Sequence, residues 1–599
     1  MIERDCDVLV VGAGGAGMRA AIAAAEAGCS TVVVTKSLLG KAHTVMAEGG
    51  IAAGIGNVDS VDSWEVHFAD TMLGGHVINN WRMVDLYAHE VIDRVYELER
   101  WGGLFDRTPD GRIMQRAFGA HSWRRLAHVG DRTGLELIRT CQDRLVHTAG
   151  AEVLMECTLV RLLLSGDAVG GAIGYDRNSG ELVLIRAAAV VMASGGWGRM
   201  YRHTSNSWEG TGDGAAMAYE AGAELQDMEF VQFHPTGMVW PPGARGILVT
   251  EGVRGEGGIL RNSEGERFME RYDPVKKDLS SRDVVARSIY KEVQAGRGSP
   301  HGGAFLDIAT RLPAAEIHRK LPSMYEQFHS LAGVDITREP MEVYPTIHYT
   351  MGGLRVEAET AATTVPGLYA AGECAAGLHG ANRLGGNSLG DILVFGRRAG
   401  EAAAEHARSR RSRPAPSAAQ VRELEALILE PLAGGEDAAD NPYTLHRDLQ
   451  EAMQDDAGIG RSEESLTRAL GAIGELRERA ARIRVAGGRV LNPGWHACWD
   501  ARFMLTISEA IVRSALARRE SRGSQWRFDF PDEEDHWSRI NLVAVRRGGE
   551  MSVEERPVPL MPDEAVQRLQ KSRFFPTAVI PAHYARVIGG GSASPEAHA

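Results

Sequence analysis

The sequence predicts an α/β protein built on a Rossmann-like nucleotide-binding domain that a second domain interrupts. The first observation is an apolar, β-branched run that begins at Cys6 and leads into Gly12-Ala-Gly14-Gly15-Ala-Gly17, after which Met18 to Ala27 is alanine-rich and helical in pattern. Such glycines let a pyrophosphate approach the helix N-terminus. The second observation is a charged stretch, punctuated by Gly and Pro, between residues 233 and 344, after which strand and glycine-turn patterns resume.

Composition excludes several classes of protein. The chain has 599 residues, a hydrophobic content of 44% and a formal net charge of −13. This charge argues against nucleic acid or an anionic membrane surface as the main partner, and we interpret the basic stretch 406–419 as a linker. No charge-free apolar run approaches the ~20 residues of a membrane span, and the N-terminus lacks a signal-peptide pattern, so we expect a cytoplasmic protein.

Cysteine spacing bears on disulfide bonds and metal ligands. The six cysteines are scattered and contain no CxxC pair, as expected of reduced thiols. They match no familiar iron–sulfur ligand spacing, and we predict no metal site in this chain.

The nucleotide motif departs from a plain NAD site. The acid expected about 20 residues after the glycines is replaced by Thr35-Lys36. Strands are predicted at 153–164, 170–175, 182–185 and 187–193, the last ending in the glycine turn Ser194-Gly195-Gly196. Asp213, before the helix 215–221, is interpreted either as a cofactor-binding acid or as a helix N-cap. Helical periodicity covers 61–102, 421–484 and 499–519, and 589–595 is expected to be a disordered tail.

One stretch decides which cofactor is expected. Ala42-His43-Thr44-Val-Met-Ala-Glu48-Gly49-Gly50-Ile resembles the flavin-carrying segment of succinate dehydrogenase and fumarate reductase flavoprotein subunits, and later landmarks of that family follow in order. The resemblance implies FAD bound covalently through His43. The cofactor-binding residues implied by the glycine motif and by the resemblance are Gly12, Gly14, Gly15, Gly17, Lys36, His43, Thr44, Glu48, Gly49, Gly50, Ser194, Gly195, Asp213, Glu373, Arg383, Ser388 and Leu389.

The resemblance also implies a dicarboxylate site beneath a capping domain. Phe118 matches the phenylalanine that lies over the substrate, although the following segment 119–130 departs from the family pattern. The residues matching carboxylate binders are His234, Thr250, His348 and Arg383. Arg282 matches the proton carrier, linked outward through Glu251 and Arg254; the alternative is that Arg282 is only a further carboxylate clamp, with Glu251 and His234 next in line as proton carriers.

The implied architecture has four parts. They are an FAD-binding domain (1–232 and 345–410), a capping domain (233–344), a helical domain (411–525) and a small C-terminal domain with the disordered tail (526–599). The implied function is oxidation of succinate to fumarate within a succinate:quinone oxidoreductase. Its partners would be an iron–sulfur subunit and cytochrome b type membrane anchors on the cytoplasmic side of the cell membrane, with quinone reached only through them.

Other functions remain open at this point. The alternatives are fumarate reduction by the same residues, L-aspartate oxidase, which usually lacks the histidine matching His43, and a non-catalytic flavin carrier. The residues shared by succinate oxidation and fumarate reduction leave the physiological direction undecided.

Overall fold

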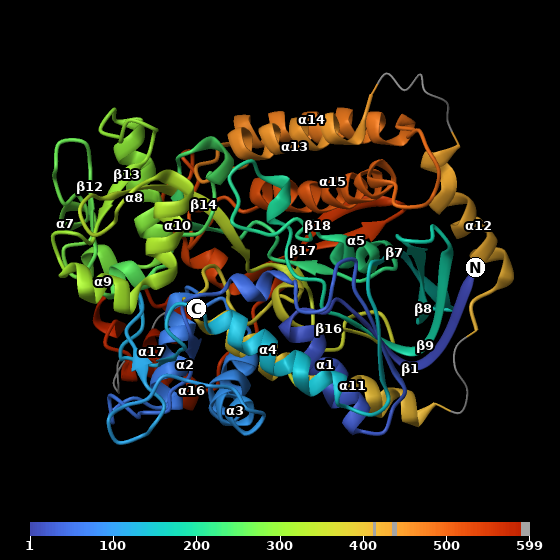
Figure 1. Ribbon diagram of the computed structural model, residues 1–599, viewed down its shortest axis with the longest axis horizontal. Coiled ribbons are helices and arrows are strands. Elements are labelled where there is room, and N and C mark those ends of the chain that lie inside the picture. Colours follow the sequence, from blue (N-terminus) through green and yellow to red (C-terminus); the bar gives the residue numbers. More distant parts are fainter. Residues whose placement is uncertain (411–414, 434–439, 589–599) are drawn as a thin grey trace, which may run out of the picture.

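The computed structural model describes residues 1–410, 415–433 and 440–588. Its parts are a parallel-sheet core, a smaller sheet-and-helix unit on one side, a layer of long helices and a C-terminal group of strands and short helices (Figure 1). The α/β architecture with a Rossmann-like core is confirmed. Parts of the predicted linker and the predicted tail, at 411–414 and 589–599, lie outside the described residues.

The core sheet has the strand order β6-β2-β1-β9-β8-β7, with β16 also paired to β9. Strands β1, β2, β6, β9 and β16 run parallel, whereas β7 and β8 are antiparallel to their neighbours. The strand bounds are β1 Ile2–Val11, β2 Thr31–Val34, β6 Ala151–Leu154, β7 Cys157–Ser165, β8 Ala168–Asp176, β9 Leu182–Met192 and β16 Leu368–Ala370. The carboxyl ends of β1, β2, β9 and β16 therefore lie along one edge, where parallel α/β sheets bind ligands.

Two strand predictions differ from the structure. The run 153–164 is divided into β6 and β7 around Glu156, whose φ of 54° is incompatible with an extended strand. The predicted strands 182–185 and 187–193 form the single strand β9, because the half-buried Arg186 continues the ladder with Asp5 instead of ending it.

Helix α1 (Gly15–Glu26) packs against α11 (Asn387–Ser409) at close range. A Cβ on Gly400 would lie 2.2 Å from Ala20 O, so only glycine allows this approach. The remaining helices around the core are α2 Trp64–Gly74, α3 Trp81–Arg100, α4 Thr133–Val146 and α5 Asp213–Glu220. Between them lie the short 3₁₀ helix η1 (His43–Met46) and the small strands β3 Ile51–Ala52, β4 Gln115–Arg116 and β5 Leu126–Ala127.

The interrupting region forms its own four-stranded sheet in the order β11-β14-β13-β12. The first strand of this region along the chain, β11 (Val231–Met238), pairs with the last one, β14 (Met341–Thr350). The chain therefore leaves the core and returns to it along neighbouring strands. The other elements are α6 Gly252–Gly255, β12 Ile259–Arg261, α7 Met269–Tyr272, α8 Arg282–Gln294, β13 Ala304–Asp307, α9 Ala314–Lys320 and α10 Pro322–Ala332. This unit, drawn in light green, projects from one side of the core (Figure 1).

After α11, the chain continues with longer helices, a pair of strands and further short helices. The helices are α12 Ala418–Leu429, α13 Pro442–Asp456, α14 Glu463–Arg482 and α15 Pro493–Ala517. Helix α15 begins six residues before the predicted Trp499, because the Asn492 side chain accepts a hydrogen bond from Trp495 N and caps the helix there. Strands β17 (Ile540–Arg547) and β18 (Glu550–Pro557) pair, with β10 (Leu225–Gln226) and β15 (Gly353–Leu354) beside them. Helices α16 (Asp563–Arg568) and α17 (Ala585–Ile588) follow.

Candidate functional site

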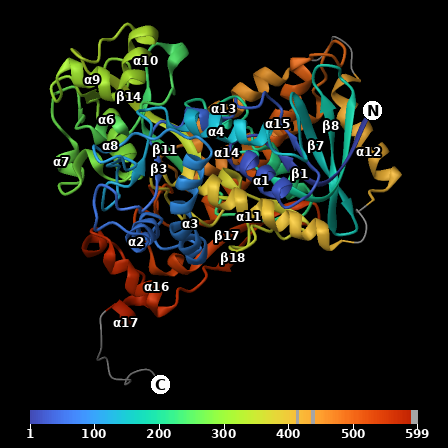
Figure 2. The same ribbon diagram turned by 60° about the horizontal axis from the view of Figure 1, so that its bottom comes forward.

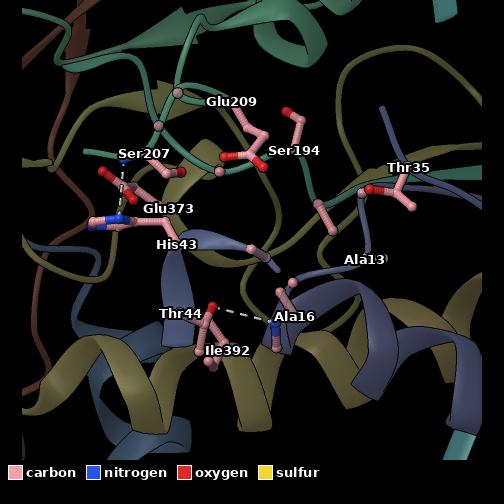
Figure 3. A pocket seen from close by; sticks show the side chains of 18 of the residues that line it. Ala13, Ala16, Thr35, His43, Thr44, Ser194, Ser207, Glu209, Glu373 and Ile392 are labelled. Atoms are coloured by element: carbon pink, nitrogen blue, oxygen red, sulfur yellow. Dashed lines mark hydrogen bonds between the residues drawn. The ribbon is translucent and has the colours of Figure 1, made fainter. Parts of the chain in front are cut away.

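A long cavity follows the carboxyl ends of the core strands and enters the space between α1, η1 and α11 (Figure 3). It contains about 1330 Å³ of space not filled by atoms, including the part open to solvent. Of the predicted cofactor-binding residues, those that line it are Gly12, Gly14, Gly15, Lys36, His43, Thr44, Ser194, Gly195, Asp213, Glu373, Ser388 and Leu389. Segments far apart in sequence thus meet at one cavity.

The glycine turn is shaped by two close backbone contacts. Gly12 has φ +109°, and a Cβ there would lie 2.3 Å from Ala193 O at the end of β9. A Cβ on Gly17 would lie 1.8 Å from Gly12 O, so Gly17 does not line the cavity but lets α1 pack onto the turn. The N-terminal amides of α1 face the cavity, a position suited to a pyrophosphate, and one of them, Gly15 N, donates to Thr44 Oγ1 at 3.3 Å.

Lys36 lies at the other end of the cavity between two carboxylates. Its Nζ is 3.3 Å from Asp213 Oδ2 and 3.2 Å from Asp500 Oδ1. Burial would lower the pKa of Lys36, but Asp213 and Asp500 together raise it above its usual value. The N-cap interpretation of Asp213 is wrong, because Gly212 in the left-handed region is the N-cap of α5, and the Asp213 carboxylate turns to Lys36 instead.

His43 lies on the cavity wall at the start of η1. Its Nδ1 accepts a hydrogen bond from Ser207 N at 3.3 Å, shown as a dashed line in Figure 3. Burial lowers the pKa of His43 to about 4, and the partly opposing influence of Glu209 does not restore it. The ring is therefore neutral at physiological pH, with its proton on Nε2.

Several polar atoms in the cavity wall lack partners among the described residues. Ser194 Oγ, Ser207 Oγ and both carboxylate oxygens of Glu209 are buried without a hydrogen bond. Buried polar groups are normally satisfied, so these atoms indicate a ligand with several hydroxyl or amide groups. The chemistry of FAD fits: a pyrophosphate for the glycine turn and hydroxyls for the orphaned oxygens. Sequence reasoning missed Ser207 and Glu209, because they lie in an irregular segment without a motif.

A second group of polar residues is buried next to this cavity, where the interrupting region, called the capping region below, meets the core. We call this group the carboxylate cluster; its members are Gln232, His234, Glu251, Arg254, Arg282, His348 and Arg383. Arg282, at the first turn of α8, donates from Nε to Glu251 Oε2 at 2.9 Å and from Nη1 to Gln232 Oε1 at 3.1 Å. Arg254 Nη2 lies 3.7 Å from the same Glu251 oxygen. Although burial would raise the pKa of Glu251, Arg282 and Arg254 hold it below its ordinary value, so the carboxylate is ionised.

Gln232 joins the two principal cations of this cluster. Its Oε1 accepts from Arg282 Nη1 and, at 3.3 Å, from Arg383 Nη2, while its Nε2 donates to Asn382 Oδ1 and Arg383 O. Sequence reasoning did not include Gln232 among the site residues, although it stands two positions before His234 on β11. Alternation along a strand, which places both side chains on one face, was the available signal.

The other predicted substrate-binding residues surround this centre. The His234 and His348 ring centroids are 5.1 Å apart, and His348 lies 6.4 Å from His43, so the two clusters are continuous. Ser205 Oγ lies 2.9 Å from His348 Nδ1, and Thr250 Oγ1 accepts from Gly252 N. Burial, followed by the charge of Arg282, lowers the pKa of both histidines well below the usual value.

Arg383 is a buried cation without a close carboxylate partner in the part of the chain that the structure describes. Its guanidinium lies 4.3 Å from the Tyr349 ring centroid, and its Nη1 donates to Ser388 Oγ. Burial and the charge of Arg282 lower its pKa to about 9. Within the same residues, Arg383 Nε and Arg254 Nε have no hydrogen-bond partner. A site with this excess of positive charge suits an anionic ligand with several acceptor oxygens.

Phe118 lies next to the Arg282 guanidinium, because a Cβ on Gly385 would lie close to both side chains. A Cβ on Gly49 would lie 2.7 Å from Phe118 Cζ, and one on Gly385 would lie 2.4 Å from Phe118 Cδ1. Four of the predicted cofactor-binding residues do not line the nucleotide cavity, namely Glu48, Gly49, Gly50 and Arg383. Burial raises the pKa of Glu48 well above its usual value, and the Arg116 guanidinium beside it donates to the backbone oxygens of Glu48 and Gly49.

All six cysteines are buried. Within the parts of the chain that the structure describes, no group of three or more His, Cys, Asp or Glu side chains is arranged to hold a metal ion. Among the helices of the described ranges, none has the length and apolar character needed to cross a membrane.

Comparison with known proteins identifies the family. The FAD binding domain family matches residues 7–389, and the fumarate reductase flavoprotein C-terminal family matches residues 446–570. The chain is 46% identical to one subunit of the fumarate reductase (CoM/CoB) of Methanothermobacter marburgensis, covering 90% of this chain and 97% of that one. It is 38% identical to the succinate dehydrogenase flavoprotein subunit of Rickettsia bellii, covering 94% and 96%.

Solved structures agree. The chain resembles a chain of the Mycobacterium smegmatis Sdh1 complex in the apo form, with 50% identity, a TM-score of 0.87, and coverage of 98% of this chain and 100% of that one. A chain of the E. coli quinol fumarate reductase structure has 36% identity and a TM-score of 0.89, with coverage of 94% and 98%. With a nucleotide cavity beside a buried cationic cluster and this degree of similarity to both kinds of enzyme, the chain belongs to the family of succinate dehydrogenase and fumarate reductase flavoprotein subunits.

Proposed function

We propose that this chain is the catalytic flavoprotein subunit of a membrane-associated succinate:quinone oxidoreductase, oxidising succinate to fumarate with FAD bound covalently through His43. The observation that carries the proposal is the pair Arg282 and Arg383, which share the Gln232 carbonyl, are buried, and lie beside two neutral histidines next to the nucleotide cavity. Arg282 is paired with Glu251, and a dicarboxylate would supply the carboxylate partner that Arg383 lacks among the described residues.

The substrate binders act by orientation. Arg383, His234, His348 and Thr250 would hold the two carboxylates, so that the central carbons of succinate have their C–H bonds correctly directed; fixing reactants in this way contributes several kcal/mol to catalysis. Bound FAD supplies the hydride acceptor. A forked guanidinium is suited to one carboxylate, because it offers two parallel N–H donors.

We assign proton transfer to Arg282. A guanidinium is a poor base in water, but this one donates to Glu251, which in turn lies near Arg254. Burial lowers the pKa of Arg254, and Glu251 opposes this only in part. A proton that leaves Arg282 would therefore pass to the ionised Glu251 carboxylate and then to the Arg254 guanidinium. The alternative role of Arg282, carboxylate clamping alone, predicts different kinetics and is tested below.

Covalent attachment is supported by the state of His43. The Ser207 amide occupies Nδ1, which leaves Nε2 as the ring nitrogen for a bond to the flavin, and the ring is neutral. Acid precipitation tests this proposal directly. A yellow, fluorescent pellet is expected, whereas FAD released entirely into the supernatant contradicts covalent attachment.

Fumarate reduction is the second candidate, favoured by the relative named fumarate reductase that is 46% identical over 90% of this chain. The same residues serve both directions, with Arg282 donating the proton when fumarate is reduced. The midpoint potential of the flavin in the assembled complex, measured against the quinone pool, distinguishes the two directions. A covalent histidyl link raises that potential and thus favours succinate oxidation.

We further propose that electrons leave through an iron–sulfur subunit held at the cytoplasmic side of the membrane by cytochrome b type anchors. The names of the relatives, which are subunits, support this assignment. The purified chain should reduce an artificial dye with succinate but should not reduce quinone efficiently. Consumption of L-aspartate and oxygen would instead identify an L-aspartate oxidase, and a non-catalytic flavin carrier would show neither activity.

A further inference from the structure

A short segment near the C-terminus lies against the loop that covers the carboxylate cluster. This segment, residues 571–574, follows directly after the family match that ends at residue 570, and we name it the C-terminal strap. The loop, residues 118–125, includes much of the segment in which the sequence departs from the family pattern. Figure 2 shows the C-terminal helices beside α2, on the side of the molecule away from α13 and α14.

The strap and the loop share one buried carboxylate. Ser572 Oγ and Ser122 Oγ both donate to Asp70 Oδ1 at 2.6 Å, and Ser122 N donates to Asp70 Oδ2 at 2.7 Å. Arg125 Nη2 is 2.9 Å from Asp70 Oδ2. Asp70, Ser122 and Ser572 are each less than 5% exposed, so loss of one donor leaves a buried acceptor unsatisfied.

Arg573 adds contacts to the loop itself. Its backbone N donates to Ser122 Oγ at 3.0 Å, its Nη1 donates to Ser122 O at 3.2 Å, and its guanidinium lies 4.7 Å from the Trp123 ring centroid. The next residue, Phe574, lies under Lys276 of the capping region, with Nζ 4.4 Å from the ring centroid. The strap therefore touches the loop, α2 and the capping region together.

The other end of the loop contacts the reaction site. Gly119 N donates to Glu251 Oε1 at 2.8 Å, and His121 Nε2 donates to Gly385 O at 2.7 Å. A Cβ on Gly119 would lie 2.3 Å from Glu251 Oε1, so the approach is close. Between them Ala120 has φ +61°, a left-handed conformation that is strained for an L-residue and persists only when the surrounding structure holds it on both sides.

We propose that Ser572 and Arg573 are positioning residues for the reaction: they fix the 118–125 loop so that Gly119 N–H keeps Glu251 oriented toward Arg282. The strap anchors Ser122, and the loop holds the Glu251 oxygen that Arg282 does not use. This inference rests on the proposed function of Glu251 and Arg282. It does not involve the carboxylate binders His234 and Arg383, which contact neither the strap nor Gly119 in any hydrogen bond of the described residues.

Loop mobility can be measured without any activity. The Arg124 side chain is 52% exposed and marks a trypsin site within the loop. In the full-length flavin-loaded protein, Ser572→Ala and Arg573→Ala should each raise the rate of tryptic cleavage after Arg124 by about fivefold or more, since a buried hydrogen bond is typically worth that much. Ser572→Thr should restore protection. Thr577→Ala, which removes a hydroxyl that donates to Phe574 O in the same segment, is the matched control.

Kinetics separate positioning from general loosening. The Ser572→Ala and Arg573→Ala variants should lower kcat for succinate about tenfold while malonate affinity stays within about twofold, because transition-state groups are disturbed and uniform binding is not. Protection and kcat both equal to wild type would overturn the proposal, as would a parallel loss of malonate affinity and kcat. If the wild-type protein does not oxidise succinate, the proposed function fails, while the cleavage rates still test the coupling of strap and loop.

Discussion

The nucleotide cavity and the carboxylate cluster adjoin each other but are built in opposite ways. The cavity is formed by strand ends, glycines and small side chains, and its orphaned oxygens belong to Ser194, Ser207 and Glu209. The cluster is formed by long polar and charged side chains: Glu251 contacts Arg282 and Arg254, and the uncharged Gln232 accepts hydrogen bonds from Arg282 and Arg383. The cavity therefore suits a ligand rich in hydroxyl groups, whereas the positive charge of the cluster favours binding of an anion.

Electrostatics sharpens the contrast. In the cluster, burial and the repulsion from Arg282 lower the pKa of Arg383 to about 9. The charged form of Arg383 is therefore destabilised by the site itself. A bound dicarboxylate relieves this repulsion. In the cavity His43 is neutral, and the charge of Lys36 is balanced by Asp213 and Asp500, so the charged groups there are paired with one another.

The largest expected effect comes from replacing Arg282, the proposed proton carrier of the cluster. Arg282→Gln should lower kcat for succinate at least ~10³-fold, the scale of general acid–base assistance, with little change in dicarboxylate affinity. Steady-state kinetics and malonate inhibition measure the two quantities. A fall in malonate affinity in step with kcat would instead assign Arg282 to carboxylate clamping and move the proton carrier to Glu251 or His234.

The next prediction distinguishes the role of Arg383 from that of Arg282. Arg383→Gln should weaken malonate binding by about 10–100-fold, because a charge-assisted, bidentate contact is lost. Malonate should then protect the Arg282→Gln variant against thermal unfolding almost as well as wild type, but protect the Arg383→Gln variant hardly at all. Equal protection of both variants would contradict the division of duties.

The cavity was largely predictable because its parts are contiguous motifs. The glycine turn and the Ala42–Ala47 stretch each keep their residues together in sequence, and the parallel sheet brings its strand ends to one edge. Glu209 was not predictable, because nothing at the level of sequence shows that its carboxylate turns inward from an irregular segment.

The cluster was predictable only through family resemblance. Its members lie on β11, before α6, at the start of α8 and before α11, and no periodicity links them. Gln232 was missed because an uncharged amide carries no signal of its role until both arginines are seen to share it. The Ser572–Asp70 hydrogen bond joins residues 502 positions apart, beyond any local pattern.

A smaller effect tests the link between cavity and reaction. His43→Ser should retain FAD, since the glycine turn, Lys36 and the wall hydroxyls remain, but acid precipitation should release it. Succinate oxidation should fall by about tenfold or more relative to fumarate reduction, because ~30 mV of two-electron potential corresponds to tenfold in equilibrium constant. Dye-coupled assays in both directions measure this ratio, and equal loss in the two directions would refute the argument from potential.

The smallest effect concerns a single carboxyl group in the cavity. Glu373 Oε1 accepts from Thr350 N at 3.1 Å, yet burial raises the pKa of Glu373 to about 7. Because the folded pKa lies above the unfolded value near 4.5, the folded state binds the extra proton between these values. The associated stability is complete below about pH 4.5 and is lost as the pH rises through about 7.

Replacing this carboxyl group by an amide removes the titration. Glu373→Gln should therefore raise the thermal midpoint of the flavin-free protein at pH 8 by ~2 °C and leave it unchanged near pH 4.5. The shift is small because a free-energy change of a few kcal/mol is divided by the large unfolding entropy of a long chain. Glu405→Gln, which removes an exposed carboxylate on α11 in the same way, is the matched control for the loss of a surface charge. A Glu373→Gln shift that is the same at pH 4.5 and pH 8 would contradict the prediction, because it would show that burial does not raise the pKa of Glu373 in the folded protein.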